Sequence, residues 1–198
     1  MSQNIAIIDL GIGNIYSIHS ALNYVTSENV IVTHDPKEIL SSDKIILPGV
    51  GAFPTAMNMI KKFDLLEPIK EKALKGNPIW GICVGMQVLG DEGFEFSKTK
   101  GLSLISGKVC RLNRIKGKIP VIGWYQTITN SDSVRGYFYF LHSYHFIAND
   151  IKYVELTYRL DGRDIVASLR KDNILGTQFH PEKSGESGIN LFRDFVKM

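Results

Sequence analysis

Short apolar runs alternate with segments of helical spacing along the first half of the chain. The runs are typical of strands covered on both faces, and they lie at residues 5–8, 30–32, 44–47 and 78–82. Apolar residues recur at intervals of three and four over 15–25, which predicts a helix. Further helical material spans 53–75, interrupted by Pro68 and followed by Gly76 as a stop signal. Strands joined by helices predict right-handed crossovers and a parallel sheet.

The second half consists mainly of strand-like segments separated by turns, which favours an antiparallel or mixed extension of the sheet. These segments are 101–112, 119–129, 137–141, 152–158, 165–169 and 174–179. A closing helix is expected over 189–196, where Ile189, Phe192 and Val196 share one face. No linker or repeat separates the halves, so we expect a single domain over residues 1–198.

The charge and cysteine content of the chain argue against several classes of partner. The 198 residues carry 23 Lys and Arg against 20 Asp and Glu, a net charge of +3 that is too small and dispersed to indicate a nucleic-acid partner. Cys83 and Cys110 provide neither a disulfide framework nor a paired metal motif. No Lys or Arg precedes Lys37, and the apolar stretch at 77–90 is short and glycine-rich. We therefore expect a cytoplasmic protein with no membrane, nucleic-acid or metal partner.

The sharpest local motif is Gly81-Ile82-Cys83-Val84-Gly85, which follows an apolar strand and precedes helix-compatible residues at 86–89. It has the form of a nucleophile elbow with cysteine as the nucleophile. Glycines flank such a turn because side chains there would collide with neighbouring backbone. The amino end of the following helix would favour the reactive thiolate. A buried, purely structural thiol is the alternative.

A second motif supplies the base that a thiol nucleophile requires. His180 and Glu182 follow the apolar segment 174–179, so both side chains emerge at the end of a strand. An imidazole accepts the proton of the nucleophile and returns it to the leaving group, and a carboxylate orients the ring. Taken alone, the pair also fits an unrelated surface turn. Together with the elbow, it indicates a Cys-His-Glu catalytic set.

A third motif, Pro48-Gly49-Val50-Gly51, follows the strand at 44–47. Its glycines free the backbone to turn N–H groups toward a ligand. The amides of Val50 and Val84 are candidate donors to a tetrahedral oxyanion. Alone, the segment also fits an ordinary strand-to-helix turn.

The chain resembles the class I glutamine amidotransferases. The similarity rests on PGVGAF at 48–53, GICVGMQ at 81–87, HSY at 142–144 and QFHPEKS at 178–184, and it runs from the opening IAIIDLGIGNI to the last helix. Within the family, the chain is most similar to the glutaminase subunits of imidazole glycerol phosphate synthase. The resemblance implies a flavodoxin-like α/β fold: a central, mostly parallel sheet with helices on both faces and an antiparallel extension.

The resemblance also implies the chemistry and the partner. Cys83 would attack the side-chain amide of L-glutamine, His180 would shuttle the proton, and Glu182 would orient His180. The released ammonia would pass into a (β/α)8 cyclase subunit, in a heterodimer that makes imidazole glycerol phosphate for histidine biosynthesis. The other residues with implied roles are Gln87, His142, Ser143 and Tyr144 for glutamine, Gly49, Val50, Gly51 and Val84 around the oxyanion, and Asn14, Trp124 and Lys183 toward the partner.

One segment departs from the family pattern. A His and an Asn usually surround a Gly-Trp pair, whereas this chain has Val121 and Tyr125 around Gly123 and Trp124. The departure leaves the hydrolytic residues intact and affects the expected partner. The alternative function is therefore a paralogous glutaminase that supplies ammonia to a sugar amidotransferase making acetamidino sugars for surface polysaccharide.

Two other protein classes are compatible with parts of the sequence. Gly11 and Gly13 follow a strand and open a helix, and Asp35 ends the next strand, as in dinucleotide-binding domains. Tyr16 stands where that motif requires its third glycine, which argues against this interpretation. A non-catalytic binding module would lack a member of the Cys-His-Glu set, and all three are present.

Overall fold

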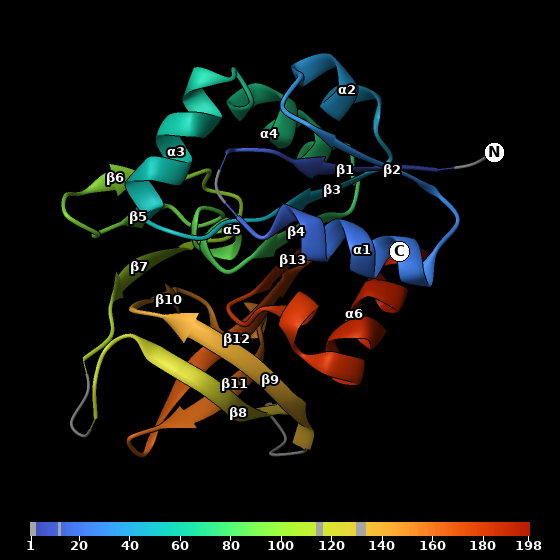
Figure 1. The fold of residues 1–198 in the computed structure, drawn as a ribbon. Coiled ribbons are helices and arrows are strands. Elements are labelled where there is room, and N and C mark those ends of the chain that lie inside the picture. The colour runs from blue at the N-terminus through green and yellow to red at the C-terminus, as the bar shows by residue number, and fades with distance from the viewer. Residues whose placement is uncertain (1–2, 12, 114–116, 130–133) are drawn as a thin grey trace.

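The computed structural model describes residues 3–11, 13–113, 117–129 and 134–198. Its centre is a nine-stranded sheet with the order β2-β1-β3-β4-β13-β12-β11-β8-β9 (Figure 1). The first five strands are parallel: β2 (Asn29–Thr33), β1 (Asn4–Ile8), β3 (Lys44–Leu47), β4 (Ile79–Ile82) and β13 (Ile174–Thr177). Counted along the chain, these five have the 2-1-3-4-5 order of flavodoxin-like folds, which confirms the predicted fold class.

The remaining strands of this sheet pair antiparallel. They are β12 (Arg163–Lys171), β11 (Val154–Leu160), β8 (Val121–Thr129) and β9 (Val134–His142). A smaller four-stranded sheet comprises β10 (Tyr144–Ala148), β7 (Gly107–Arg111), β5 (Glu92–Gly93) and β6 (Thr99–Lys100). The strands β8, β9, β11 and β12 form the lower part of the molecule in Figure 1, on the opposite side from the parallel strands.

Helices cover both faces of the parallel strands, as predicted (Figure 1). On one face lie α2 (Pro36–Ser41), α3 (Phe53–Lys62) and α4 (Leu66–Leu74), and on the other α1 (Ile15–Val25) and α6 (Gly185–Lys197). The single turns are α5 (Val84–Gln87), η1 (Ile151–Tyr153) and η2 (Pro181–Lys183).

Several elements differ from their predicted bounds. The helical stretch at 53–75 breaks near Asp64, which has φ +55°. Pro68 does not interrupt it, because it lies in the first turn of α4, where backbone N–H groups have no partner within the helix. Gly76 ends the stretch with φ +82°, as predicted. Only 107–111 of the predicted strand 101–112 is a long strand, because Gly101 and Leu102 instead donate to the carbonyls of Asp91 and Val88.

The core of the parallel region is centred on Trp80. Its indole is fully buried and lies against Phe192 and Phe195 of α6, with ring centroids 4.9 and 5.3 Å apart. The indole N–H donates to Thr177 Oγ1 at 3.1 Å, so β4 and β13 are also joined through their side chains. These contacts fix α6 directly behind the two central strands.

We expect Phe192→Ala to lower the free energy of unfolding by about 4 kcal/mol, because it leaves a cavity against Trp80. Leu74→Ala is the matched control, since Leu74 is 89% exposed, and it should change that free energy by less than about 0.5 kcal/mol. Urea denaturation of both variants checks the expectation. Equal losses would show that α6 does not anchor the core.

Candidate active site

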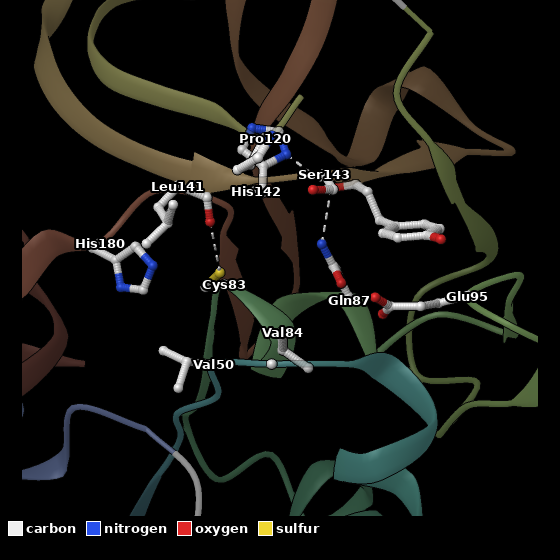
Figure 2. A pocket seen from close by; sticks show the side chains of 12 residues that line it. Val50, Cys83, Val84, Gln87, Glu95, Pro120, Leu141, His142, Ser143 and His180 are labelled. Atoms are coloured by element: carbon white, nitrogen blue, oxygen red, sulfur yellow. Dashed lines mark hydrogen bonds between the residues drawn. The ribbon is translucent and has the colours of Figure 1, made fainter. Parts of the chain in front are cut away.

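The candidate catalytic residues follow neighbouring parallel strands. In the sheet register, Leu47 of β3 lies opposite Gly81 of β4, and Thr177 of β13 lies opposite Ile82. The loops after these strands therefore meet at the carboxyl edge of the sheet, the usual position of a binding site in such folds. They line a pocket closed from the other side by Leu141 and the turn between β9 and β10 (Figure 2).

Cys83 forms the strained turn that the elbow motif predicts. Its backbone has φ 56° and ψ −110°, a conformation that costs energy for a residue with a side chain. A β-carbon at Gly81 would lie 2.5 Å from the carbonyl oxygen of Gly85, and one at Gly85 would lie 1.7 Å from that of Leu47. Both glycines are therefore required for the turn to pack against β3.

His180 and Glu182 form a buried pair beside the cysteine. His180 Nδ1 lies 2.9 Å from Glu182 Oε1, and the two side chains are only 3% and 1% exposed. Figure 2 shows the imidazole next to the Cys83 sulfur. Within the described part of the chain, His180 Nε2 has no hydrogen-bond partner, so this nitrogen is available for proton transfer. The three predicted residues thus share one site.

Two opposing effects act on the pKa of His180. Burial alone would lower it, but the side chains of Cys83 and Glu182 together outweigh burial and raise the pKa above its ordinary value. The raised pKa favours a protonated ring, which matches the role of a proton donor to a leaving amine.

One of the two candidate oxyanion donors is already engaged in this structure. The amide of Val84 donates to the carbonyl oxygen of Gly49 at 3.3 Å. A β-carbon at Gly49 would lie 3.0 Å from the Gly85 nitrogen, so the loop after β3 packs directly on the elbow. Gly51 adopts φ +99°, which favours glycine. For Val84 to bind an oxyanion, the segment containing Gly49, Val50 and Gly51 has to move first.

The helix after Cys83 is shorter than predicted. α5 covers only 84–87 instead of continuing to 89. One helical turn aligns few peptide dipoles, so its field at the sulfur is weaker than that of a full helix. A side-chain donor reaches the sulfur instead: Gln178 Nε2 lies 3.7 Å from Cys83 Sγ.

Gln87 and Tyr144 meet on the far side of the pocket. Gln87 Nε2 donates to the carbonyl oxygen of Tyr144 and to Gln178 Oε1, both at 3.0 Å. These bonds use both amide hydrogens and leave Gln87 Oε1 as an acceptor. Ser143 also lines the pocket.

The imidazole of His142 faces away from this pocket (Figure 2). His142 Nδ1 lies 2.8 Å from the carbonyl oxygen of Tyr144, and Nε2 lies 2.9 Å from the hydroxyl of Tyr158. Since a carbonyl only accepts, Nδ1 carries the hydrogen and Nε2 accepts from Tyr158. Only the backbone of His142 can therefore contact a ligand in the pocket.

Glu95 is a pocket residue that the sequence motifs did not indicate. Its Oε2 accepts from the Phe53 amide at 2.8 Å, at the amino end of α3. Burial raises the pKa of Glu95, and the hydrogen bond from Phe53 partly offsets that rise. Figure 2 shows the Glu95 carboxylate and the side-chain oxygen of Gln87 on the same side of the pocket. Both groups can accept hydrogen bonds from an ammonium group.

The three partner-facing candidates do not line this pocket; Trp124 and Lys183 are exposed, and Asn14 is half-buried. Trp124 is 54% exposed and packs edge-on against Tyr139 at 6.0 Å, and Lys183 Nζ lies 5.9 Å from the same ring. Asn14 lies at the start of α1, in a turn whose Gly13 approaches Pro48 of the loop after β3.

The departures from the family pattern lie on the other face of β8. Val121 is fully buried, and Tyr125 packs against Phe140 and Tyr158 with centroids 5.8 and 5.2 Å apart. Since side chains alternate along a strand, Trp124 faces outward while these two face the core. The replacements therefore change the core of the antiparallel region rather than its surface.

Other candidate features have structural explanations. Asp35 caps α2 by accepting from the Lys37 amide at 2.8 Å, which accounts for the acidic residue of the dinucleotide motif. Over the described ranges, no three His, Cys, Asp or Glu side chains are grouped as metal ligands, and no helix is long and apolar enough to cross a membrane.

Comparison with known proteins shows to which family the chain belongs. The model of the family "Glutamine amidotransferase class-I" matches residues 6–198. This chain belongs to the class I glutamine amidotransferases. Proteins named "Imidazole glycerol phosphate synthase subunit HisH" from Lactococcus lactis subsp. lactis and Caldanaerobacter subterraneus subsp. tengcongensis are each 42% identical to it. Both alignments cover 98% of this amidotransferase and 98% of the relative.

Solved structures agree with this amidotransferase in fold. One titled "Crystal structure of glutamine amidotransferase" aligns with TM-score 0.77 at 16% identity, covering 98% of this chain and 99% of the other. "Structure of PurLQS from Thermotoga maritima" aligns with TM-score 0.75 at 20% identity, covering 100% and 99%.

The buried His142 of this amidotransferase leads to a pH prediction. Burial lowers its pKa from 6.5 to about 4. Between these values the unfolded chain binds a proton that the folded chain excludes, so stability falls as pH falls. From pH 7 to pH 4, the wild type should lose about 3 kcal/mol more stability than His142→Asn, which keeps a donor for Tyr144. Urea denaturation at both pH values measures the difference, and equal losses would refute it.

Proposed function

We propose that this chain is the glutaminase subunit of an imidazole glycerol phosphate synthase in histidine biosynthesis. It hydrolyses L-glutamine to glutamate and ammonia and supplies the ammonia to a partner subunit. The observation that carries the proposal is the buried His180–Glu182 pair beside the strained Cys83. The relatives named HisH, 42% identical over 98% of the chain, support the assignment to this synthase.

In the first half of the reaction, the Cys83 sulfur attacks the side-chain carbonyl carbon of glutamine. The carbonyl oxygen becomes an oxyanion, for which the amides of Val84 and Val50 are the donors once the loop after β3 has moved. His180 Nε2 gives its proton to the leaving nitrogen, and the C–N bond breaks. The products of this half are ammonia and a γ-glutamyl thioester on Cys83.

In the second half, His180 takes a proton from a water molecule, and the resulting nucleophile attacks the thioester. The C–S bond breaks, glutamate leaves, and the sulfur and imidazole return to their starting forms. Glu182 holds the imidazole through Nδ1 and stabilises its positive charge in both halves.

The pocket offers complementary groups to the α-ammonium and α-carboxylate groups of glutamine. Gln87 Oε1 and the Glu95 carboxylate are acceptors for the α-ammonium group. The backbone N–H groups of Ser143 and Tyr144 would donate to the α-carboxylate. Gln87 Nε2 and the His142 ring both donate to the Tyr144 carbonyl and so hold this segment in place. The side-chain amide of glutamine then extends toward Cys83.

The partner in this proposal is a (β/α)8 cyclase that docks on the surface formed by Asn14, Trp124 and Lys183. Trp124 and Lys183 both contact Tyr139, whose backbone oxygen accepts from the His180 amide at 2.9 Å. Docking there would act close to the catalytic pair. In this proposal, docking activates the glutaminase by breaking the Val84–Gly49 hydrogen bond, because the Val84 amide has to be released before it can stabilise the oxyanion. We place the complex in the cytoplasm.

Cys83→Ala should reduce glutaminase turnover by at least about 10⁴-fold, because no thioester can form. Cys110→Ala is the matched control, since Cys110 is a free thiol in β7, outside the pocket, and it should retain wild-type turnover. Glutamate release measured with the partner present checks both. Turnover retained in Cys83→Ala would remove the nucleophile assignment.

A second experiment tests the partner. Adding a cyclase subunit of imidazole glycerol phosphate synthase should raise glutamine turnover about tenfold or more, because docking opens the Val84–Gly49 bond. Trp124→Ala and Lys183→Ala should weaken this stimulation, whereas the exposed Leu74→Ala should not. Stimulation by the barrel subunit of an acetamidino-sugar system, but not by the cyclase, would contradict the assigned pathway.

A further inference from the structure

Gln178 lies between the nucleophile and the glutamine-binding side of the pocket. It directly follows β13 and is fully buried. Its backbone amide donates to the Ala167 carbonyl at 2.8 Å, which fixes the main chain to β12. Its side chain is therefore held in place where it touches both Cys83 Sγ and Gln87 Nε2.

The hydrogen-bond partners determine which end of the Gln178 amide faces the sulfur. The carbonyl of Tyr144 can only accept, so the side chain of Gln87 must present its NH2 group to it. The second hydrogen of that group then points at Gln178, which has to offer its oxygen. With Oε1 engaged, the Gln178 NH2 group is left facing Cys83 Sγ at 3.7 Å.

Inverting either amide would break this arrangement. If Gln178 were turned over, two NH2 groups would face each other across 3.0 Å and an oxygen would face the sulfur. If Gln87 were turned over, its oxygen would face the Tyr144 carbonyl, which already accepts from His142 Nδ1. Each alternative places like groups together in a buried region and leaves them without hydrogen-bond partners, which is unfavourable.

We propose that Gln178 is a further catalytic residue that donates a hydrogen bond to the Cys83 sulfur and joins it to the glutamine-binding side of the pocket. A donor aimed at a buried sulfur stabilises its negatively charged, reactive form. Since α5 is a single turn, the side chain of Gln178 supplies stabilisation that a longer helix would otherwise provide. The chain of contacts from Tyr144 through Gln87 and Gln178 also sets the position of the sulfur relative to bound glutamine.

This role rests on the proposed glutaminase activity, so the test begins without glutamine. The rate of Cys83 alkylation by iodoacetamide at pH 7 reports the reactive thiolate directly. Gln178→Met keeps the length of the side chain and removes both the donor and the acceptor. Gln178→Glu keeps an acceptor for Gln87 but removes the donor to the sulfur.

Both variants should alkylate at Cys83 at least about tenfold more slowly than the wild type, with Gln178→Glu the slower because it adds a like charge. With the cyclase partner present, turnover should fall in both. The KM for glutamine should rise about fivefold or more in Gln178→Met, where Gln87 loses a partner, and stay within about twofold in Gln178→Glu. If Gln178 had a purely structural role, Gln178→Glu would not combine slow alkylation of Cys83 with a nearly unchanged KM for glutamine.

Ser168→Ala controls for loss of a buried polar group in the adjacent strand β12, because its hydroxyl donates to Glu155 outside the pocket. It should lower thermal stability without slowing alkylation. Wild-type alkylation rates in folded, active Gln178→Met and Gln178→Glu would overturn the role of Gln178. Failure of the proposed function itself would appear differently, as full turnover in Cys83→Ala.

Discussion

The close approach of the loop after β3 to the turn at Cys83 is the contact on which the site depends. The carbonyl oxygens of Leu47 and Gly85 occupy the space that β-carbons at Gly85 and Gly81 would need. With both positions clear, the chain reverses at the end of β4 and holds Cys83 at φ 56°. The strain is stored locally and supported by the parallel strands on either side. A relaxed turn would withdraw the sulfur from His180.

The pocket itself is formed between two differently built regions. The parallel strands supply Cys83 and His180, the proposed nucleophile and base, because β4 and β13 are neighbours and their carboxyl ends coincide. The antiparallel strands supply the opposite wall, where Leu141 and Tyr144 flank the turn between β9 and β10. The side-chain amide of Gln87 joins the two regions by donating to the Tyr144 carbonyl. In the proposed reaction, the buried contacts from Tyr144 through Gln87 and Gln178 join the glutamine-binding side of the pocket to the Cys83 sulfur.

Much of this could be predicted from the sequence, because the decisive signals are local. Cys83, His180 and Glu182 each follow an apolar run that ends at the same sheet edge. Glu95 has no such local pattern. Its side chain is held by a hydrogen bond from the Phe53 amide, and Phe53 lies 42 residues earlier in the chain. α2 and the two-residue strands were too short to show a period. The hydrogen bond from the Val84 amide to Gly49 likewise could not be predicted, because it depends on how the loop after β3 packs against the turn at Cys83.

The most direct test of the account is chemical capture of the covalent intermediate during turnover. The complex would be mixed with isotope-labelled glutamine, quenched in acid within one turnover, digested and analysed by mass spectrometry. A γ-glutamyl thioester is expected on the peptide containing Cys83, and none on the peptide containing Cys110, although Cys110 is the less buried thiol. Turnover with no label on Cys83, or with label on Cys110, would contradict it.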